Sequence, residues 1–147
     1  MDVHTKETRS YNMSQIKNKN TKPEELVRKD LFRRGLRYRK NVKKLPGCPD
    51  IVLTRYRTVV FVNGCFWHVH EGCKYFKWPQ NNKEFWETKL SGNKKRDFDN
   101  ICELERLGWK VIVVWECELK KQFKAERLDK LYTEITGNEL LFPIGVE

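Results

Sequence analysis

The 147-residue sequence contains no apolar run that approaches the roughly 20 residues of a membrane-spanning helix. Its longest apolar stretches, Val59–Val62 and Val111–Trp115, have only the length of strands. The chain also lacks an opening segment in which positive charges precede an apolar stretch, as in secretion signals. We therefore expect no membrane partner and a cytoplasmic location, which in a bacterium is shared with the nucleoid.

An even set of cysteines is also lacking, because the chain has five, at positions 48, 65, 73, 102 and 117. An odd number without a secretion signal argues against a disulfide framework and indicates free thiols or a bound metal ion. Cys48 and Cys102 stand apart from the others, and we interpret them as buried thiols that act as small apolar residues.

Acidic residues are scarce in the first third of the chain. Residues 1–44 hold 14 Lys/Arg against 5 Asp/Glu, whereas residues 45–147 hold 16 against 15, so nearly all of the net charge of +10 lies in the first segment. Dispersed basicity often serves solubility alone, but a concentrated basic segment favours a polyanion partner, since each neutralised phosphate releases condensed counterions. This distribution favours nucleic acid as the partner.

The length suits a single domain, and 39% hydrophobic with 34% charged residues is typical of a globular, water-soluble chain. Residues 1–20 are polar and lack a sustained period, which indicates a mobile arm with at most a helical turn around Tyr11–Ile16. Thr21, Pro23 and Glu24 then have the spacing of a helix N-terminus with a capping box.

Periodicity and turn residues predict the other elements. Two strands separated by a short turn at Tyr56-Arg57 form an antiparallel hairpin, and the whole pattern predicts an α/β fold with a small mixed sheet flanked by helices. The expected helices cover Thr21 to Gly35, Lys83 to Leu107 with a break at Ser91–Asn93, and 125–136, and the expected strands are Leu36–Arg39, Asp50–Leu53, Thr58–Val62 and Lys110–Glu116.

Three residues that bind soft metal ions, Cys65, His70 and Cys73, stand within nine positions, and Cys117 follows directly after a predicted strand. Three thiolates and one imidazole suit a closed tetrahedral zinc site, which has no open position for water and folds an otherwise unsupported loop. Buried free cysteines are the competing explanation, but an irregular loop offers little core to hide them. His68 is the alternative histidine ligand.

Asp50 follows Pro49 at the start of a predicted strand, where a carboxylate can supply a hard oxygen for a cation such as Mg²⁺. The pair alone is weak evidence, because Pro-Asp commonly opens turns. Its significance depends on the hairpin partner, which brings Val62, Asn63 and Gly64 opposite Asp50.

A set of motifs extends over most of the chain, from about Arg9 to Leu119. The motifs are Arg9-Ser10-x-Asn12-Met13, Leu45-Pro46-Gly47-x-Pro49-Asp50, Gly64-Cys65-Phe66-Trp67-His68-x-His70, Phe85-Trp86, Arg96-Asp97, Gly108-Trp109 and Trp115-Glu116-Cys117. Together they resemble the very short patch repair endonucleases, and the long Gly-Cys-Phe-Trp-His string makes this resemblance specific. The resemblance implies a fold similar to the PD-(D/E)xK restriction endonucleases, with residues 1–20 as a DNA-contacting arm and residues 21–147 as the endonuclease domain.

The resemblance implies that Asp50 holds a catalytic Mg²⁺, which would stabilise charge on the scissile phosphate. The second acidic residue usual in this fold is absent, because Phe61-Val62-Asn63 is not acidic. The family uses a backbone carbonyl that maps to Val62, and such a ligand does not depend on the side chain. Asn63 stands where relatives can carry histidine, and we assign it no role.

By the same resemblance, His68 activates the attacking water and Asp97 orients the imidazole, whose ordinary pKa near neutrality suits proton transfer. Taken alone, Asp97 could be a solvated helix charge, and Asp99 is a close competitor. Glu24 would help to hold metal-bound water, although a capping-box glutamate needs no catalytic explanation.

Three aromatic residues, Phe66, Trp67 and Trp86, would act as wedges that enter the base stack beside a mismatch. Phe66 and Trp67 are adjacent in a metal-bound loop, so we expect them to be exposed, whereas Trp109 and Trp115 should be core residues. The resemblance and the charge of the arm assign further DNA contacts to Met13, Lys6, Arg9, Lys17 and Lys19.

Together these residues predict a monomeric, Mg²⁺-dependent endonuclease with a structural Zn²⁺, which nicks one strand of double-stranded DNA. The target implied by the resemblance is a T:G mismatch left by deamination of 5-methylcytosine, with functional links to a cytosine-5 methyltransferase and to mismatch-repair proteins. Two alternatives stay open: a non-catalytic zinc-stapled DNA-binding module, and a restriction-type endonuclease of the same fold.

Overall fold

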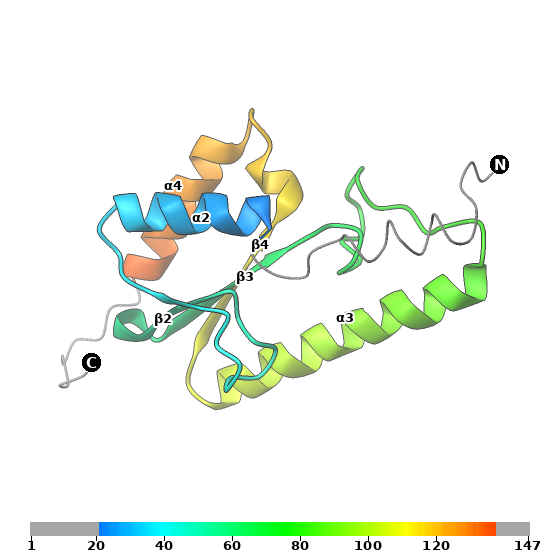
Figure 1. Ribbon diagram of the computed structural model, residues 1–147, viewed down its shortest axis with the longest axis horizontal. Coiled ribbons are helices and arrows are strands. Elements are labelled where there is room, and N and C mark those ends of the chain that lie inside the picture. Colours follow the sequence, from blue (N-terminus) through cyan, green and yellow to red (C-terminus); the bar gives the residue numbers. More distant parts are fainter. Residues whose placement is uncertain (1–20, 138–147) are drawn as a thin grey trace.

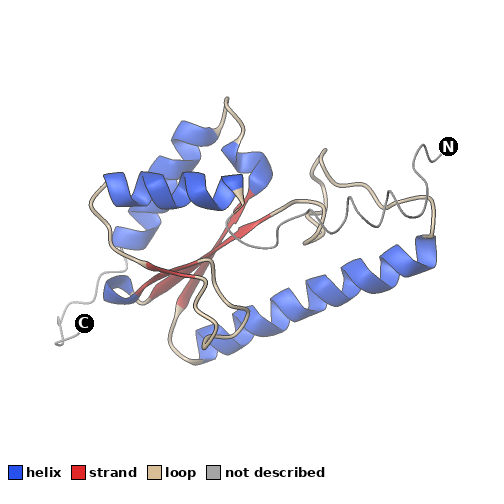
Figure 2. Cartoon of the chain, in the orientation of Figure 1, coloured by secondary structure: helices blue, strands red, loops and turns tan. Residues whose placement is uncertain are grey.

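The computed structural model describes residues 21–137. Its sheet has four strands in the order β1-β2-β3-β4. Figure 2 shows the strands lying between the helices. β2 pairs antiparallel with both of its neighbours, β1 and β3, whereas β3 and β4 run parallel. The predicted α/β fold with a small mixed sheet is therefore confirmed. The strands are β1 (Arg39–Lys40), β2 (Ile51–Leu53), β3 (Thr58–Asn63) and β4 (Lys110–Trp115).

Helices cover both faces of this sheet (Figure 1). Helices α2 (Lys22–Arg33) and α4 (Lys124–Thr136) lie side by side on one face, and the long α3 (Lys83–Arg106) crosses the other. Within these residues no helix combines the length and the apolar character needed to span a membrane.

Alternation along the central strands explains the two cores. Val60 and Val62 of β3 face α2 and α4, whereas Val59 and Phe61 face α3 and its buried Leu104. Successive strand residues point to opposite faces, so the continuous apolar run of β3 fills both layers. Each buried valine or leucine contributes about 1.5–3 kcal/mol of transfer free energy, which makes β3 the centre of the fold.

The start of α2 departs from its expected form. Thr21 occupies the N-cap position, but its side chain makes no capping hydrogen bond. Glu24 is buried, and its carboxylate accepts a hydrogen bond from Arg28 at 3.1 Å. The predicted capping box is therefore wrong, because the glutamate turns inward to a buried partner one helical turn away. Gly35, with φ of 94°, ends the helix as expected.

Two further elements differ from the prediction. Helix α3 is continuous through Ser91–Asn93, because buried Leu90 anchors this stretch and the Asn93 amide donates to the Trp67 carbonyl. These contacts outweigh the cost of about 1 kcal/mol for a mid-helix glycine. The first strand is Arg39–Lys40, because pairing with β2 begins there while Leu36 packs into the core.

Candidate active site and metal cluster

Asp50 lies where β2 begins, beside a part of β3 that has no backbone partner in β2. The pairing of β2 with β3 stops at Ile51 and Val60, whereas β3 continues to Asn63. The Asp50 side chain fills this position, and its Oδ2 accepts a hydrogen bond from the Val62 N–H at 2.7 Å. The N–H and C=O of a strand residue point to the same neighbour, so the Val62 carbonyl faces this edge too.

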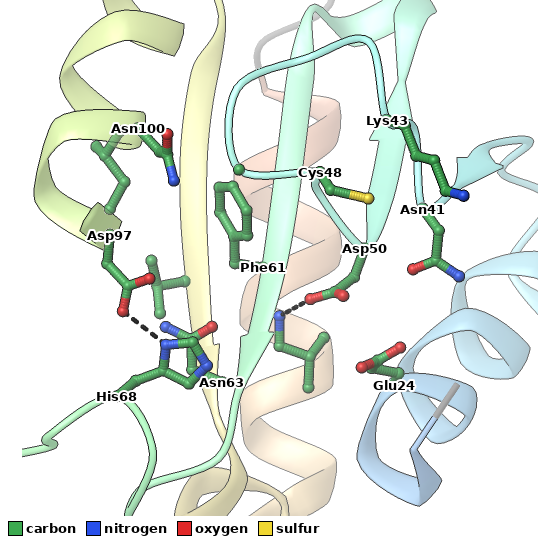
Figure 3. Close-up of a pocket in the computed structure, with 14 residues that line it drawn as sticks. Glu24, Asn41, Lys43, Cys48, Asp50, Phe61, Asn63, His68, Asp97 and Asn100 are labelled. Carbon is green, nitrogen blue, oxygen red and sulfur yellow. Dashed lines mark hydrogen bonds and ion pairs between the residues drawn. The ribbon is translucent and has the colours of Figure 1, made fainter. Parts of the chain in front are cut away.

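The Asp50 pocket, a cavity of about 330 Å³, opens at this edge between the start of α2 and the middle of α3. In Figure 3 Asp50 and Glu24 approach from one side, and His68 and Asp97 from the other. The cavity is lined in addition by residues of the β1–β2 loop, β3, β4 and α3: Asn41, Lys43, Gly47, Cys48, Phe61, Val62, Asn63, Asn100, Ile101 and Val113.

Burial, and to a smaller extent the nearby charge of Glu24, raise the pKa of Asp50 to about 7, although the hydrogen bond from Val62 lowers it. A carboxylate in such surroundings is stabilised when a cation neutralises it. Asp50, the Val62 carbonyl and Glu24 offer the hard oxygen ligands that Mg²⁺ prefers, with room in the cavity for its waters.

Arg28 connects Glu24 to the strand that carries Asp50. Its guanidinium donates to the carboxylate of Glu24, to the side-chain oxygen of Asn41 at 3.3 Å and to the backbone oxygen of Asp50 at 3.4 Å. Sequence reasoning passed over Arg28, although a glutamate followed four residues later by an arginine is the spacing of a helical ion pair. The bridge holds the Glu24 carboxylate and the Asp50 backbone at the pocket.

His68 and Asp97 meet from two elements, since His68 follows β3 and Asp97 lies on α3. His68 Nδ1 and Asp97 Oδ2 are 2.6 Å apart, as an orienting carboxylate requires. Asp99 instead forms an exposed ion pair with Lys95 at 3.2 Å. The structure thus brings together His68 and Asp97, and within residues 21–137 the imidazole Nε2 has no hydrogen-bond partner.

A second group of potential ligands, the zinc-ligand cluster of Cys65, His70, Cys73 and Cys117, lies just beyond the ends of β3 and β4. Their ligand atoms all fall within 4.8 Å of one another. Cys117 Sγ and His70 Nδ1 are 3.5 Å apart, close to the roughly 3.6 Å separation expected for two ligands of a tetrahedral zinc. This donor set fits a closed zinc site.

The choice of His70 over His68 follows from the local backbone. Val69, with φ of 53°, adopts the left-handed conformation and turns the chain between the two histidines. The His70 ring stacks on Trp115, with centroids 4.0 Å apart and an angle of 2° between the planes. Trp115 is the last residue of β4 and stands two positions before Cys117, so this one contact positions two of the ligands.

Thiols in this cluster need a cation to ionise together. Burial, and then the neighbouring Cys73 and Cys65 thiols, raise the pKa of Cys117 to about 12. A divalent ion would reverse this effect by neutralising the thiolates. Of the remaining thiols, Cys48 is half-buried and lines the Asp50 pocket, whereas Cys102 is exposed on α3, so its interpretation as a buried residue was wrong.

The three aromatic residues expected to act as wedges form one cluster. Phe66 packs edge-on against Trp67 and Trp86, with centroids 5.1 and 5.5 Å apart. All three are half-buried over a small core of Val69, Phe76 and Leu90, so the expected exposure of Phe66 and Trp67 is only partial. Each ring buries part of its surface against a neighbouring ring.

Two other tryptophans are less buried than expected. Trp109 and Trp115 are half-buried rather than central to the core. Trp109 packs against the α3-side core and lies under the Arg57 guanidinium, whose carbon is 4.5 Å from the ring centroid. The predicted contacts of the arm, Met13, Lys6, Arg9, Lys17 and Lys19, and the turn at Tyr11–Ile16 lie outside the described residues.

Comparison with known proteins places this site in a family. Residues 1–74 match the model of the family described as DNA mismatch endonuclease Vsr. The type II nicking enzyme V.NmeAIP of Neisseria meningitidis is 53% identical over 135 residues, which cover 91% of this chain and 96% of that protein.

Two further relatives agree with this assignment. The DNA mismatch endonuclease Vsr of Escherichia coli is 45% identical over 84% of this chain and 78% of its own length. The type II nicking enzyme V.XorIIP of Xanthomonas oryzae is 46% identical over 77% of this chain and 82% of its own length. The chain therefore belongs to the Vsr DNA mismatch endonuclease family and is a DNA endonuclease.

Proposed function

We propose that this endonuclease nicks one strand of double-stranded DNA next to a T:G mismatch arising from deamination of 5-methylcytosine, with Mg²⁺ in the Asp50 pocket. The observation that carries the proposal is the convergence, in one cavity, of the Asp50 carboxylate, the Val62 edge and the His68–Asp97 pair. A DNA-binding module without catalysis has no use for an imidazole oriented by a carboxylate.

The residues divide the hydrolysis between them. When bound, Mg²⁺ supplies positive charge to the scissile phosphate and lowers the pKa of its waters. Asp50 and the Val62 carbonyl would hold the ion, and Glu24, fixed by Arg28, would accept a hydrogen bond from water in the pocket. His68 accepts the proton of the water that attacks phosphorus, while the P–O bond to the leaving strand breaks and the leaving oxygen takes a proton from solvent water. Asp97 stabilises the imidazolium that results.

We assign a structural Zn²⁺ to the zinc-ligand cluster. With four protein ligands the ion has no position for substrate, so its function is to fold residues 64–82, which contain no helix or strand. The same loop carries His68, Phe66 and Trp67, and zinc would therefore position the catalytic and the aromatic residues together. The overall arrangement supports the expected relation to the PD-(D/E)xK fold.

Mismatch recognition is assigned to the aromatic cluster. Phe66, Trp67 and Trp86 present a half-buried apolar surface beside the pocket, and unstacking a base step costs less where a mismatch already weakens it. Rings that support one another can enter the stack without losing all of their packing. The name of the Escherichia coli relative, DNA mismatch endonuclease Vsr, supports a mismatch as the target.

The test uses T:G and T:A duplexes with a different fluorophore on each strand, incubated with zinc-loaded protein with and without Mg²⁺. We expect one strand of the T:G duplex to be cut, only with Mg²⁺. Cutting of both strands, equal cutting of the T:A duplex, or binding without cutting would contradict the proposal.

A second candidate is a nick whose position is set by the flanking sequence more than by the mismatch. The 53% identity to a type II nicking enzyme favours it. Randomising the base pairs around the T:G pair separates the two: this candidate expects loss of nicking in most contexts, whereas mismatch-directed nicking persists.

A further inference from the structure

The stretch from Leu31 to Pro49 contains seven lysines and arginines and no acidic residue. Three of these cations have intramolecular partners. Arg33 and Arg34 both pair with Asp30, and the guanidinium carbon of Arg37 lies 4.1 Å from the ring centroid of Phe32. These contacts stabilise three of the seven cations, and the four cations that follow along the chain lie outside them.

The other four cations, Arg39, Lys40, Lys43 and Lys44, form what we term the basic rim. All four are exposed, and none forms an ion pair with another residue of the 21–137 segment. Four like charges within six positions repel one another, so their proximity disfavours the free protein unless an anionic partner neutralises them.

The basic rim is presented by an ordered hairpin rather than by a loose loop. β1 is an edge strand, and the loop after it is closed by backbone hydrogen bonds from Asn41 N to the Asp50 oxygen and from Cys48 N to the Leu45 oxygen. Gly47 lies so close to Phe61 and Asn100 that an added Cβ would be 3.1 Å from each. The backbone that carries these cations is therefore held in place.

This hairpin also forms one wall of the Asp50 pocket. Lys43 lines the cavity, and in Figure 3 it extends along the rim above Asn41, on the side of Asp50 away from His68. Arg28 donates a hydrogen bond of 3.3 Å to Asn41 and also bonds Glu24 and the Asp50 backbone, so one side chain links the start of this loop to the pocket. A phosphate at Asp50 would have its neighbour on the same strand near Lys43.

We propose that the basic rim is a DNA-backbone contact, which binds the phosphates on one side of the phosphate held at Asp50. The proposal rests on the proposed function for the position of the DNA. Contacts to phosphate place the duplex in register and carry no sequence information. The basic rim would thus align the strand, while the aromatic cluster on the far side of His68 detects the mismatch.

The test measures duplex binding in the Asp50→Asn background, where cleavage does not interfere. Lys43→Gln/Lys44→Gln and Arg39→Gln/Lys40→Gln are compared with Lys121→Gln/Lys124→Gln, a matched pair of exposed lysines near the start of α4. For each rim pair we expect the slope of log K against log[KCl] to fall by about 1–2, since each lost phosphate contact removes about 0.9.

Affinity at about 0.1 M salt should fall by about tenfold or more for each rim pair, by the same factor for T:G and fully paired duplexes. The control pair should leave both quantities unchanged. Lys43→Arg/Lys44→Arg keeps the charge and should retain the wild-type slope, which separates a charge effect from a structural one.

An unchanged salt slope in the rim variants, or an equal change in the control pair, would overturn the proposal. Lysines on an edge strand can also prevent pairing with another chain. That role predicts aggregation of the rim variants with unaltered binding by the monomer, and this outcome would overturn it as well. Because the slope is measured on paired DNA without cleavage, a failure of mismatch-directed nicking leaves this test intact.

Discussion

Two groups of potential metal ligands lie at the same end of the sheet, the zinc-ligand cluster and the Asp50 pocket. In the cluster, three of the four ligands come from nine consecutive residues, and the fourth follows a strand. In the pocket, the polar groups come from α2, β2, β3, the following loop and α3. The first is a local site with a full set of side-chain ligands, and the second is assembled from distant segments.

This difference indicates a structural role for the zinc-ligand cluster and a catalytic role for the Asp50 pocket. A complete tetrahedral set leaves no position for a substrate, so the cluster stabilises the loop. The pocket supplies few protein oxygens, so the Mg²⁺ that we propose there would keep positions for water and phosphate. The predictions below separate the two roles.

The largest effect should come from removing a zinc ligand. Cys73→Ser should release the zinc and lose much of the roughly 10 kcal/mol or more that structural zinc contributes to small domains. Nicking should be lost as well, because the loop carries His68. Zinc content and the thermal midpoint are the measurements.

Cys102→Ser is the matched control for this substitution, because Cys102 is exposed on α3 and outside the cluster. It should retain zinc, stability and nicking. A Cys73→Ser protein with full zinc content and an unchanged midpoint would remove the structural role from the account.

Removing the carboxylate of the pocket should abolish chemistry without unfolding the chain. Asp50→Asn should reduce the nicking rate by at least about 10²–10³-fold, since a transition-state charge contact is lost. The asparagine oxygen can still accept the Val62 N–H, so folding and T:G binding should persist. Asp129→Asn, at an exposed partner of Arg34, is the control and should nick normally. Residual nicking near the wild-type rate would refute the assignment.

The orientation of His68 should matter less than the metal ligand. Asp97→Asn should lower the nicking rate by about 10²-fold, because the imidazole loses the carboxylate that stabilises its protonated form. Asp99→Asn lies two residues away on the same helix and should have no effect, because Asp99 forms an exposed ion pair with Lys95 and does not line the pocket. Equal effects of the two substitutions would show that His68 does not depend on Asp97.

The aromatic cluster should affect selectivity more than rate. Trp67→Ala should reduce the preference for T:G over T:A duplexes by about tenfold, the equivalent of a few kcal/mol or less of unstacking. Phe98→Ala removes an exposed ring of α3 outside the cluster and serves as control. Unchanged discrimination by the Trp67 variant would exclude the wedge.

The smallest effect is a dependence of stability on pH in protein without Mg²⁺. The pKa of Asp50 is raised from 3.8 to about 7, so between these values the folded protein binds a proton that the unfolded chain releases. Unfolding free energy therefore decreases as pH rises through this window. Asp50→Asn should remove the decrease and stabilise the Mg²⁺-free protein at pH 8 by about 1–3 kcal/mol. Denaturant unfolding at pH 5 and pH 8 would show no such difference if the carboxyl were solvated.

The contrast between the two sites also explains what the sequence could predict. Three of the four zinc ligands are predictable from spacing, because ligands close along the chain are close in space, whereas Cys117 is predictable only from its place after a strand. The hairpin followed from two β-branched runs separated by a turn. The interior position of Glu24, its bridge through Arg28 and the continuity of α3 depend on packing between distant segments, which periodicity does not report.

The pocket itself was predicted through resemblance rather than spacing. Nothing in Pro49-Asp50 distinguishes a metal ligand from a turn. The sequence also does not distinguish Asp97 from Asp99, because only the packing of α3 against the loop after β3 brings Asp97 to His68. The aromatic residues were misjudged for a related reason: adjacent rings in a loop can bury one another. Side chains that act on a neighbour across the fold require the structure.

The most direct test of two separate metal sites is to measure both ions on the same variants. Mn²⁺ binding, followed by electron paramagnetic resonance with a duplex present, is compared with zinc content in the wild type, Asp50→Asn and Cys102→Ser. The account predicts that Asp50→Asn keeps its zinc and loses the Mn²⁺ signal of the bound ion, whereas Cys102→Ser keeps both. Wild-type Mn²⁺ binding by Asp50→Asn, or loss of zinc from it, would contradict the account.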